Sequence, residues 1–164
     1  MNESFQQAEE RARGYTKEYG ILLNQKIGFG NDGVVWKTNR ESVLKAAMRL
    51  EPYERERDVY RRLMDLELSQ VHGFAIPRLL NYSNKYLVIE MELVIPPFVI
   101  DFGKAYLDQP PDYPAEALAE WWVEREELYE PHQWPLVRKV LATFAAHGIH
   151  YFDPQPGNIR FPPK

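Results

Sequence analysis

The chain has 164 residues and no cysteine, which predicts one domain, or one domain of two small lobes, and excludes disulfides and thiolate metal sites. Its hydrophobic content of 45% is typical of a globular protein, and its net charge of −4, without a basic stripe, argues against a nucleic-acid partner. The polar N-terminus and the lack of a long apolar run predict a cytoplasmic protein with no signal peptide and no membrane partner.

Residues 1–20 are expected to form an N-terminal helix or arm in which no chemistry is visible. Residues 21–38 are an apolar run and then a β-branched run, separated by three glycines in the spacing G-x-G-x-x-G, at Gly28, Gly30 and Gly33. A strand, and not a helix, follows these glycines. This favours a flap whose backbone N–H groups approach phosphates over a dinucleotide-binding fingerprint. A plain hairpin is the alternative interpretation.

Lys45 lies in an apolar strand, two residues after Val43, and a buried lysine needs a charged partner. Residues 52–68 show the apolar spacing of a helix, and Glu56 falls on the same face as Val59. We therefore predict that Glu56 pairs with Lys45. The alternative is that Glu56 is one of several surface acids on an exposed helix.

Two further strand-like segments, residues 78–82 and 86–93, bring the number of short strands to five, with one helix after the third. A pair of prolines then interrupts the pattern. We place a lobe boundary there, with an N-terminal lobe over 21–95 and a reduced, mainly helical second lobe over 96–164.

The second lobe begins with Asp101-Phe102-Gly103 and a proline-rich linker. An acidic helix with two adjacent tryptophans is predicted over 115–130, and an apolar helix over 134–146. We interpret the tryptophans as helix packing, with a partner surface as the alternative.

A stiff loop with prolines and glycine follows the last helix and presents Asp153 and, five positions later, Asn158. A carboxylate and an amide on such a loop are suited to orienting a hydroxyl and holding a metal ion. The alternative is that both side chains only make turn hydrogen bonds. Because Gly148 interrupts the helix between His147 and His150, we do not expect a zinc site there.

These motifs together resemble the protein-kinase-like fold over about residues 20–161. The glycine flap is similar to the kinase glycine-rich loop, the strand with the lysine to the phosphate-binding strand, and the stiff loop to the catalytic loop. The residues that carry the resemblance are, in chain order, Gly28, Gly30, Gly33, Val35, Lys45, Glu56, residues 87–91, Gly148, Asp153, Pro156 and Asn158.

The resemblance implies an α+β fold with a five-stranded antiparallel N-terminal lobe, and ATP and Mg²⁺ as ligands. The glycine flap and Lys45 would hold the ATP phosphates, and Glu56 would hold Lys45 in place. Val35 and Val43 would form an apolar roof over adenine. The backbone of Glu90–Glu92 would hydrogen-bond the edge of adenine.

The resemblance also implies the reaction, with Asp153, Lys45 and Glu56 as the catalytic residues. Asp153 would orient or deprotonate an acceptor hydroxyl, and Asn158 together with Asp153 would bind Mg²⁺. The γ-phosphoryl group of Mg-ATP would move to that hydroxyl, for which protein serine or threonine is one candidate. The acceptor itself is unknown from the sequence.

Several positions depart from the kinase pattern. Tyr151-Phe152 precedes the catalytic-type Asp where His-Arg is common, and Gln155 stands where Ser/Thr kinases carry a lysine. The chain reaches Lys164 without a second Asp-Phe-Gly, activation segment or substrate-binding helices, so we expect a reduced second lobe.

The one Asp-Phe-Gly, at 101–103, precedes the catalytic-type loop. Asp101 could cap a helix, face the ribose of the nucleotide or ligate the metal, and chain order favours the first two.

Two other hypotheses compete with the enzyme. One is a catalytically inactive pseudokinase that acts as a nucleotide- or partner-binding module. The other is one half of a split system, in which a homodimer mate or a partner protein completes the second lobe.

Overall fold

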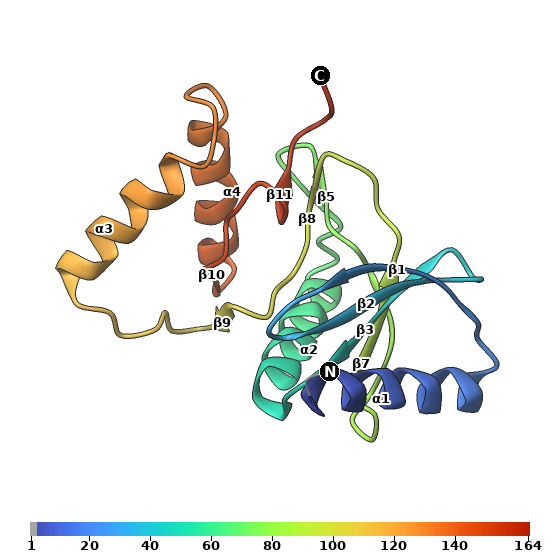
Figure 1. The fold of residues 1–164 in the computed structure, drawn as a ribbon. Coiled ribbons are helices and arrows are strands. Elements are labelled where there is room, and N and C mark those ends of the chain that lie inside the picture. Colours follow the sequence, from blue (N-terminus) through green and yellow to red (C-terminus); the bar gives the residue numbers. More distant parts are fainter. Residues whose placement is uncertain (1–2) are drawn as a thin grey trace.

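The computed structural model describes residues 3–164, which form four helices and eleven strands (Figure 1). In chain order these are α1 (Glu3–Tyr19), β1 (Leu23–Phe29), β2 (Gly33–Thr38), β3 (Ser42–Ala47), α2 (Leu50–Asp65), β4 (Gln70–Val71), β5 (Phe74–Ala75), β6 (Leu79–Ser83), β7 (Val88–Glu92), β8 (Phe98–Val99), β9 (Ala105–Leu107), α3 (Ala115–Glu126), α4 (Trp134–Ala146), β10 (Ile149–Tyr151) and β11 (Ile159–Arg160).

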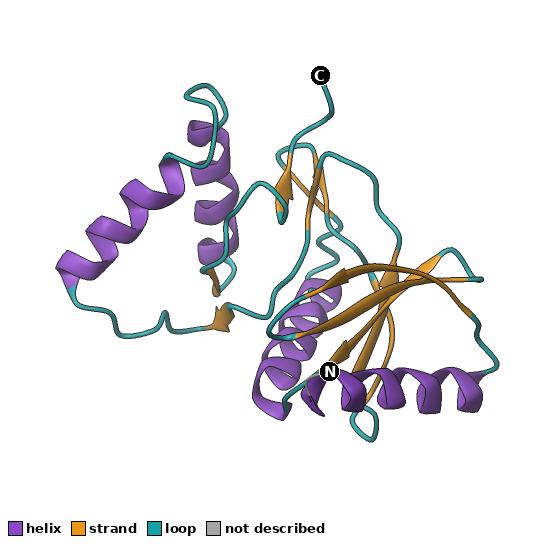
Figure 2. Cartoon of the chain, in the orientation of Figure 1, coloured by secondary structure: helices purple, strands orange, loops and turns teal. Residues whose placement is uncertain are grey.

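The N-terminal half is built on a five-stranded antiparallel sheet with strand order β1-β2-β3-β7-β6. Helix α1 covers one face and helix α2 covers the other (Figures 1 and 2). Side chains alternate between the faces of a strand, so Val43 packs on the α2 side while Leu44 packs on the α1 side. Every residue of β3 is buried. The predicted α+β arrangement, with five antiparallel strands and one helix after the third, is confirmed.

Helix α1 is more than an arm. Ala8, Ala12 and Tyr15 are fully buried against the sheet. The guanidinium of Arg11 donates to the backbone carbonyl oxygens of Ala47 and Met48, at 2.8 and 3.0 Å. These contacts fix the helix across the outer face of the sheet, so that the central strands β3 and β7 are buried on both sides.

Helix α2 has the amphipathic face predicted from its spacing. It begins at Leu50, so that Pro52 lies in the first turn, where the lack of an N–H is tolerated. Glu56, Val59 and Leu63 share its buried face. A buried carboxylate therefore points from α2 toward the sheet.

The chain also contains short strands, β4, β5 and β8 to β11, that the sequence pattern does not reveal. Strands β4 and β5, of two residues each, pair with one another as an antiparallel hairpin. This hairpin belongs to a four-stranded sheet of order β11-β8-β5-β4, and β9 pairs with β10 separately. Strands of two or three residues carry no measurable periodicity, which is why they were not predicted.

The two helices of the second half differ in burial. Helix α4 buries Val137, Val140 and Phe144, whereas α3 has no buried residue and ends at Glu126, before the expected position 130. The paired tryptophans pack toward the rest of the chain, with Trp121 against Phe152 and Trp122 against Trp134, and this supports the packing interpretation. None of the helices in residues 3–164 is long and apolar enough to cross a membrane.

A buried hydrogen-bond network joins α1 to the sheet. The carboxylate of Glu90, which is 6% exposed, accepts from the Tyr15 hydroxyl at 2.8 Å and from Ser42 Oγ at 2.6 Å. Burial and the neighbouring Glu90 raise the pKa of Tyr15 above its usual value, so the phenol remains a donor. Both carboxylate oxygens of Glu90 thus have a donor.

Substituting Tyr15→Phe should lower the free energy of unfolding by about 1–3 kcal/mol, because one buried carboxylate oxygen of Glu90 loses its donor. Urea unfolding followed by circular dichroism measures this change. Tyr19→Phe is the matched control, since Tyr19 lies on the same helix but is 40% exposed, and its effect should be about 0.5 kcal/mol or less. Equal effects of the two substitutions would contradict the proposed contribution of the network.

Candidate active site

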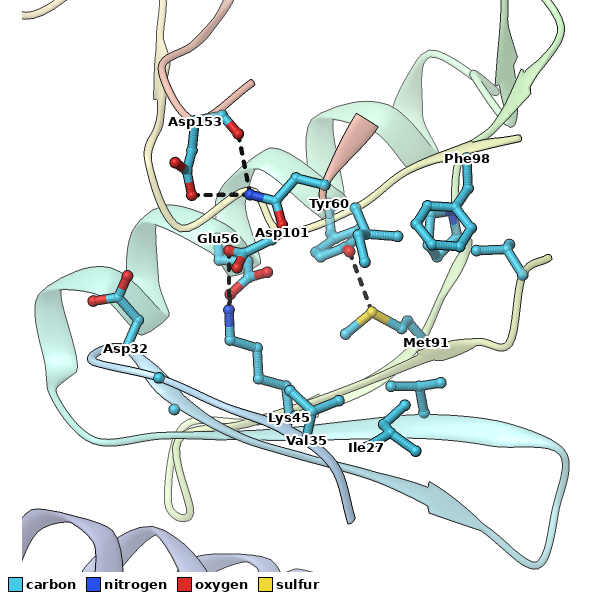
Figure 3. A pocket seen from close by; sticks show the side chains of 18 of the residues that line it. Ile27, Asp32, Val35, Lys45, Glu56, Tyr60, Met91, Phe98, Asp101 and Asp153 are labelled. Carbon is cyan, nitrogen blue, oxygen red and sulfur yellow. Dashed lines mark hydrogen bonds and ion pairs between the residues drawn. The ribbon is translucent and has the colours of Figure 1, made fainter. Parts of the chain in front are cut away.

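A cavity of about 450 Å³ opens between the main sheet and the second half of the chain (Figure 3). Its walls come from the β1–β2 hairpin, β3, α2, the segment after β7, the loop after β8 and the loop after β10. The sequence-predicted residues that line it are Gly28, Gly30, Gly33, Val35, Val43, Lys45, Glu56, Glu92, Asp101, Asp153 and Asn158. The cavity therefore brings together residues from both halves of the sequence.

Lys45 lies between two carboxylates at the inner part of the cavity (Figure 3). Its Nζ is 2.7 Å from Glu56 Oε2 and 3.2 Å from Asp101 Oδ1. The other oxygen of Glu56 accepts from the backbone N–H of Phe102 at 3.2 Å. The side chains of Lys45 and Glu56 are only 9% and 4% exposed, so the pair is buried as well as close.

The charges of this cluster are coupled. Burial alone disfavours the ammonium of Lys45, but the carboxylates of Glu56 and Asp101 outweigh this effect and raise its pKa. Burial also works against ionised Asp101, yet Lys45 lowers the pKa of Asp101 below its usual value. For Glu56, burial dominates and raises the pKa, although Lys45 opposes the shift. Two carboxylates thus face one ammonium.

Strand pairing explains how Asp101 reaches this cluster. The loop with Asp101 connects β8 to β9, and the loop with Asp153 connects β10 to β11. Strand β8 pairs antiparallel with β11, and β9 pairs antiparallel with β10. Two backbone bonds tie the loops together: the N–H of Ile100 donates to the carbonyl of Asn158, and that of Phe152 donates to the carbonyl of Lys104, each at 2.9 Å. The two loops therefore lie side by side despite their separation in sequence.

The loop conformation corrects one interpretation of Asp101. The loop leads into strand β9, and the next helix begins only at Ala115, so the helix-capping interpretation is wrong. Asp101 has φ of 62°, a left-handed conformation that Asp tolerates better than most residues. Phe102 is fully buried and packs edge-on against Tyr60 and Tyr151, which anchors the loop.

Asp153, labelled in Figure 3, forms a pair with Asn158 on the loop between β10 and β11. The amide nitrogen of Asn158 donates to the backbone oxygen and to Oδ2 of Asp153, at 3.0 and 2.9 Å. These bonds include the turn contact considered from the sequence, but they leave the amide oxygen of Asn158 without a bond among residues 3–164. Burial raises the pKa of Asp153, although the ammonium of Lys104, 3.8 Å away, opposes the shift.

Packing within the protein requires glycine at only one of the three glycine positions of the hairpin. A Cβ on Gly33 would lie 2.5 Å from the carbonyl oxygen of Ala46, so the packing of β2 on β3 requires glycine there. A Cβ on Gly28 would meet only Val35, at 3.9 Å, and one on Gly30 would meet nothing within 4 Å. The protein's own packing therefore does not explain the glycines at positions 28 and 30.

The C-terminal end of β7 requires a correction. Glu90 does not line the cavity, because its side chain points to the α1 face of the sheet. Glu92 does line it, with its carboxylate bonded to Arg78 Nε at 2.8 Å. The wall also includes Met91, Leu93 and Val94, so the part of this segment that faces the cavity begins one residue later than expected.

Five polar lining residues were not predicted as site residues: Asn31, Asp32, Tyr60, Lys104 and Gln155. Asp32 lies within the glycine hairpin and forms an ion pair with Arg49 at 3.1 Å. Tyr60 follows Glu56 by one helical turn, so the apolar stripe of α2 could have identified it; its hydroxyl donates to Met91 Sδ. Lys104 directly follows Asp101-Phe102-Gly103, but only the strand pairing brings it beside Asp153, and no local signal shows this.

No family profile and no curated protein sequence matches this chain. It is similar to the solved ADP-bound aminoglycoside phosphotransferase APH(2'')-Ib, with 21% identity over 52% of this chain and 28% of that chain, at a TM-score of 0.39. It is also similar to APH(2'')-IIa in its streptomycin–ATP complex (18% identity, 85% and 37% coverage, TM-score 0.40) and its gentamicin complex (16%, 85% and 37%, 0.39).

The chain spans only 28% to 37% of the length of these solved proteins. The site is therefore described from the contacts within this chain alone.

Substituting Lys45→Met should destabilise the protein by about 3–5 kcal/mol, because it leaves Glu56 buried without its cation. Glu56→Leu should also destabilise it. The double substitution should recover most of the loss, since an apolar pair of similar volume replaces the ion pair. Urea unfolding of the four proteins gives the coupling free energy. Additive effects of the two substitutions would contradict the pairing.

Proposed function

We propose that this chain binds Mg-ATP in the cavity and transfers its γ-phosphoryl group to an acceptor hydroxyl. One observation carries the proposal: the Lys45–Glu56–Asp101 cluster and the Asp153–Asn158 pair line the same cavity as the glycine hairpin. Figure 3 shows Lys45, Glu56, Asp101 and Asp153 in this cavity. Phosphoryl transfer depends mainly on positioning and on stabilising charge, and these residues offer both.

The adenosine part of ATP would occupy the apolar end of the cavity. Val35 and Val43 lie on the sheet side, and Met91 and Ile100 also line the wall. The volume of about 450 Å³ lies within the usual range for small-molecule sites. Backbone groups of the segment 92–94 would hydrogen-bond the adenine edge, because this segment lines the cavity just after β7 ends.

The phosphates would lie between the glycine hairpin and Lys45. Gly28 and Gly30 leave open space where a side chain would otherwise stand, which allows backbone N–H groups to approach phosphate oxygens. Lys45 is the buried cation on the facing strand, and Glu56 fixes its position. The pairing with two carboxylates keeps Lys45 charged over the working pH range.

The donor set fits Mg²⁺. Within residues 3–164, no group of three or more His, Asp or Glu side chains forms a metal site alone. Mg²⁺ commonly uses one or two carboxylates together with phosphate oxygens and water. The carboxylate of Asp101 and the amide oxygen of Asn158 would supply the protein ligands, with Asp153 nearby. When bound, the ion would neutralise charge on the phosphates.

Asp101 is better placed to bind the metal ion than to bind the ribose of the nucleotide. Asp101 contacts Lys45, the residue expected at the phosphates, and it lies in the loop that pairs with the catalytic-type loop. Its pKa is lowered, so the carboxylate is ionised and able to bind a cation at neutral pH.

Asp153 would be the general base. Its carboxylate is partly buried, and Asn158 holds it from one side through Oδ2, which leaves Oδ1 for the acceptor hydroxyl. The acceptor oxygen would form a bond to the γ-phosphorus, the bond from that phosphorus to the β–γ bridging oxygen would break, and the hydroxyl proton would pass to Asp153. Protein serine or threonine is one candidate acceptor, and a small-molecule hydroxyl is another.

Calorimetric titration should detect Mg-ATP binding to the wild-type chain. Lys45→Met should abolish or strongly weaken this binding, because the central phosphate contact is lost. Asp153→Asn should retain binding but lower ATP consumption by about 10²–10⁴-fold, the range for removing a general base. Lys139→Met, on α4 and outside the cavity lining, is the control expected to behave like wild type.

These outcomes separate the hypotheses. Mg-ATP binding without consumption by the wild type would favour the inactive nucleotide-binding module. No binding of any nucleotide would contradict the proposal.

The rate of ATP consumption should fall as the pH is lowered through the raised pKa of Asp153, because only the ionised carboxylate accepts a proton. Burial causes this raised value, so the acidic limb should lie above about pH 4, the ordinary range for Asp. A pH–rate profile at constant ionic strength tests this. A rate unchanged down to pH 4 would contradict the assignment of Asp153 as the base.

A further inference from the structure

The cavity contains few positive charges for a phosphoryl-transfer site. Among the described residues, only Lys45 and Lys104 are lysine or arginine side chains that line it. Lys45 is already held by Glu56 and Asp101. The transition state of phosphoryl transfer spreads negative charge over three oxygens of the γ-phosphoryl group, so a second cation beside the base would be useful there.

The backbone of Lys104 is held by a hydrogen bond, whereas its ammonium makes no hydrogen bond among residues 3–164. Its carbonyl oxygen accepts from the N–H of Phe152, the residue before Asp153, at 2.9 Å. Its Nζ is 3.8 Å from Asp153 Oδ1, which is too long for a hydrogen bond, and its side chain is 55% exposed. The ammonium therefore lies close to the carboxylate of Asp153 without a hydrogen bond to it. It remains able to bind a phosphoryl oxygen placed between the two side chains.

Other cations near this region do not line the cavity. Arg125 lies over the ring of Trp121 and 3.9 Å from Glu124; its buried Nε has no hydrogen-bond partner among residues 3–164, but its side chain does not line the cavity. Arg55 donates to the carbonyl of Gly103 and to Glu51. At position 155, two residues after Asp153, the side chain is a glutamine without charge.

We propose that Lys104 is a further catalytic residue, whose ammonium binds oxygens of the γ-phosphoryl group of ATP during its transfer. This inference rests on the proposed function of the same cavity. Lys104 and Asp153 would then hold the two partners of one step, the ammonium binding the phosphoryl oxygens and the carboxylate receiving the hydroxyl proton. As the acceptor oxygen–phosphorus bond forms and the bond to the bridging oxygen breaks, ADP leaves with the bonding electron pair.

The direct test compares two nucleotides that differ in the γ-phosphoryl group. Calorimetry with Mg²⁺ would measure the affinities of ADP and of the non-hydrolysable ATP analogue AMP-PNP for wild type, Lys104→Gln and Lys104→Arg. Lys104→Gln should weaken AMP-PNP binding by about tenfold, the scale of one charged hydrogen bond, and leave ADP affinity within about twofold. Lys104→Arg should restore part of the AMP-PNP affinity, because it keeps the positive charge.

The matched control is Lys85→Gln. Lys85 is also an exposed lysine beside a carboxylate, 3.0 Å from Glu18, but it does not line the cavity. It should leave both affinities unchanged. ATP consumption adds a second measurement, in which Lys104→Gln should lower kcat by about tenfold or more, while the charge-retaining Lys104→Arg lowers it less.

The outcomes distinguish this inference from the proposed function. If wild type binds AMP-PNP and ADP, but Lys104→Gln weakens both equally or neither, Lys104 does not contact the γ-phosphoryl group and the inference is wrong. If wild type binds neither nucleotide, the proposed function fails, and this inference fails with it.

Discussion

A buried lysine that requires charged partners is the constraint on which the rest of the structure depends. Lys45 lies on a strand that is buried along its whole length, and an ammonium there is stable only with a carboxylate in contact. Glu56 from α2 supplies the first carboxylate and Asp101 the second. The pairing therefore fixes the face of α2, the position of the loop after β8 and the inner end of the cavity.

The sequence predicts the parts of this arrangement that local patterns encode. Helical spacing places Glu56 on the inward face of α2, and an apolar strand around Lys45 indicates that it is buried. The same patterns do not place Asp101, because its position depends on pairing of β8 and β9 with strands about 40 to 60 residues later in the chain. Side chains alternate along β7, so Met91 faces α2 and Glu90 faces α1. The backbone contact of Glu90–Glu92 with adenine stays a prediction.

Strand pairing, and not chain order, brings the two acidic loops together. The loop with Asp101 comes before the loop with Asp153 in the sequence, but antiparallel pairing on both sides holds them next to each other. The cavity then contains more carboxylate than ammonium charge, with Glu56, Asp101 and Asp153 facing Lys45 and Lys104. A divalent cation would balance this excess and connect the protein to phosphate oxygens. In the proposed function, the ionised Asp101 would bind this cation and the partly buried Asp153 would accept the proton.

The most direct test of this account is a crystal structure of the chain with AMP-PNP and Mn²⁺, whose anomalous scattering locates the metal. The account predicts triphosphate density between the glycine hairpin and Lys45, with an Mn²⁺ peak bound to Asp101 and Asn158. Nucleotide density outside the cavity, or a metal peak that contacts neither Asp101 nor Asn158, would contradict it.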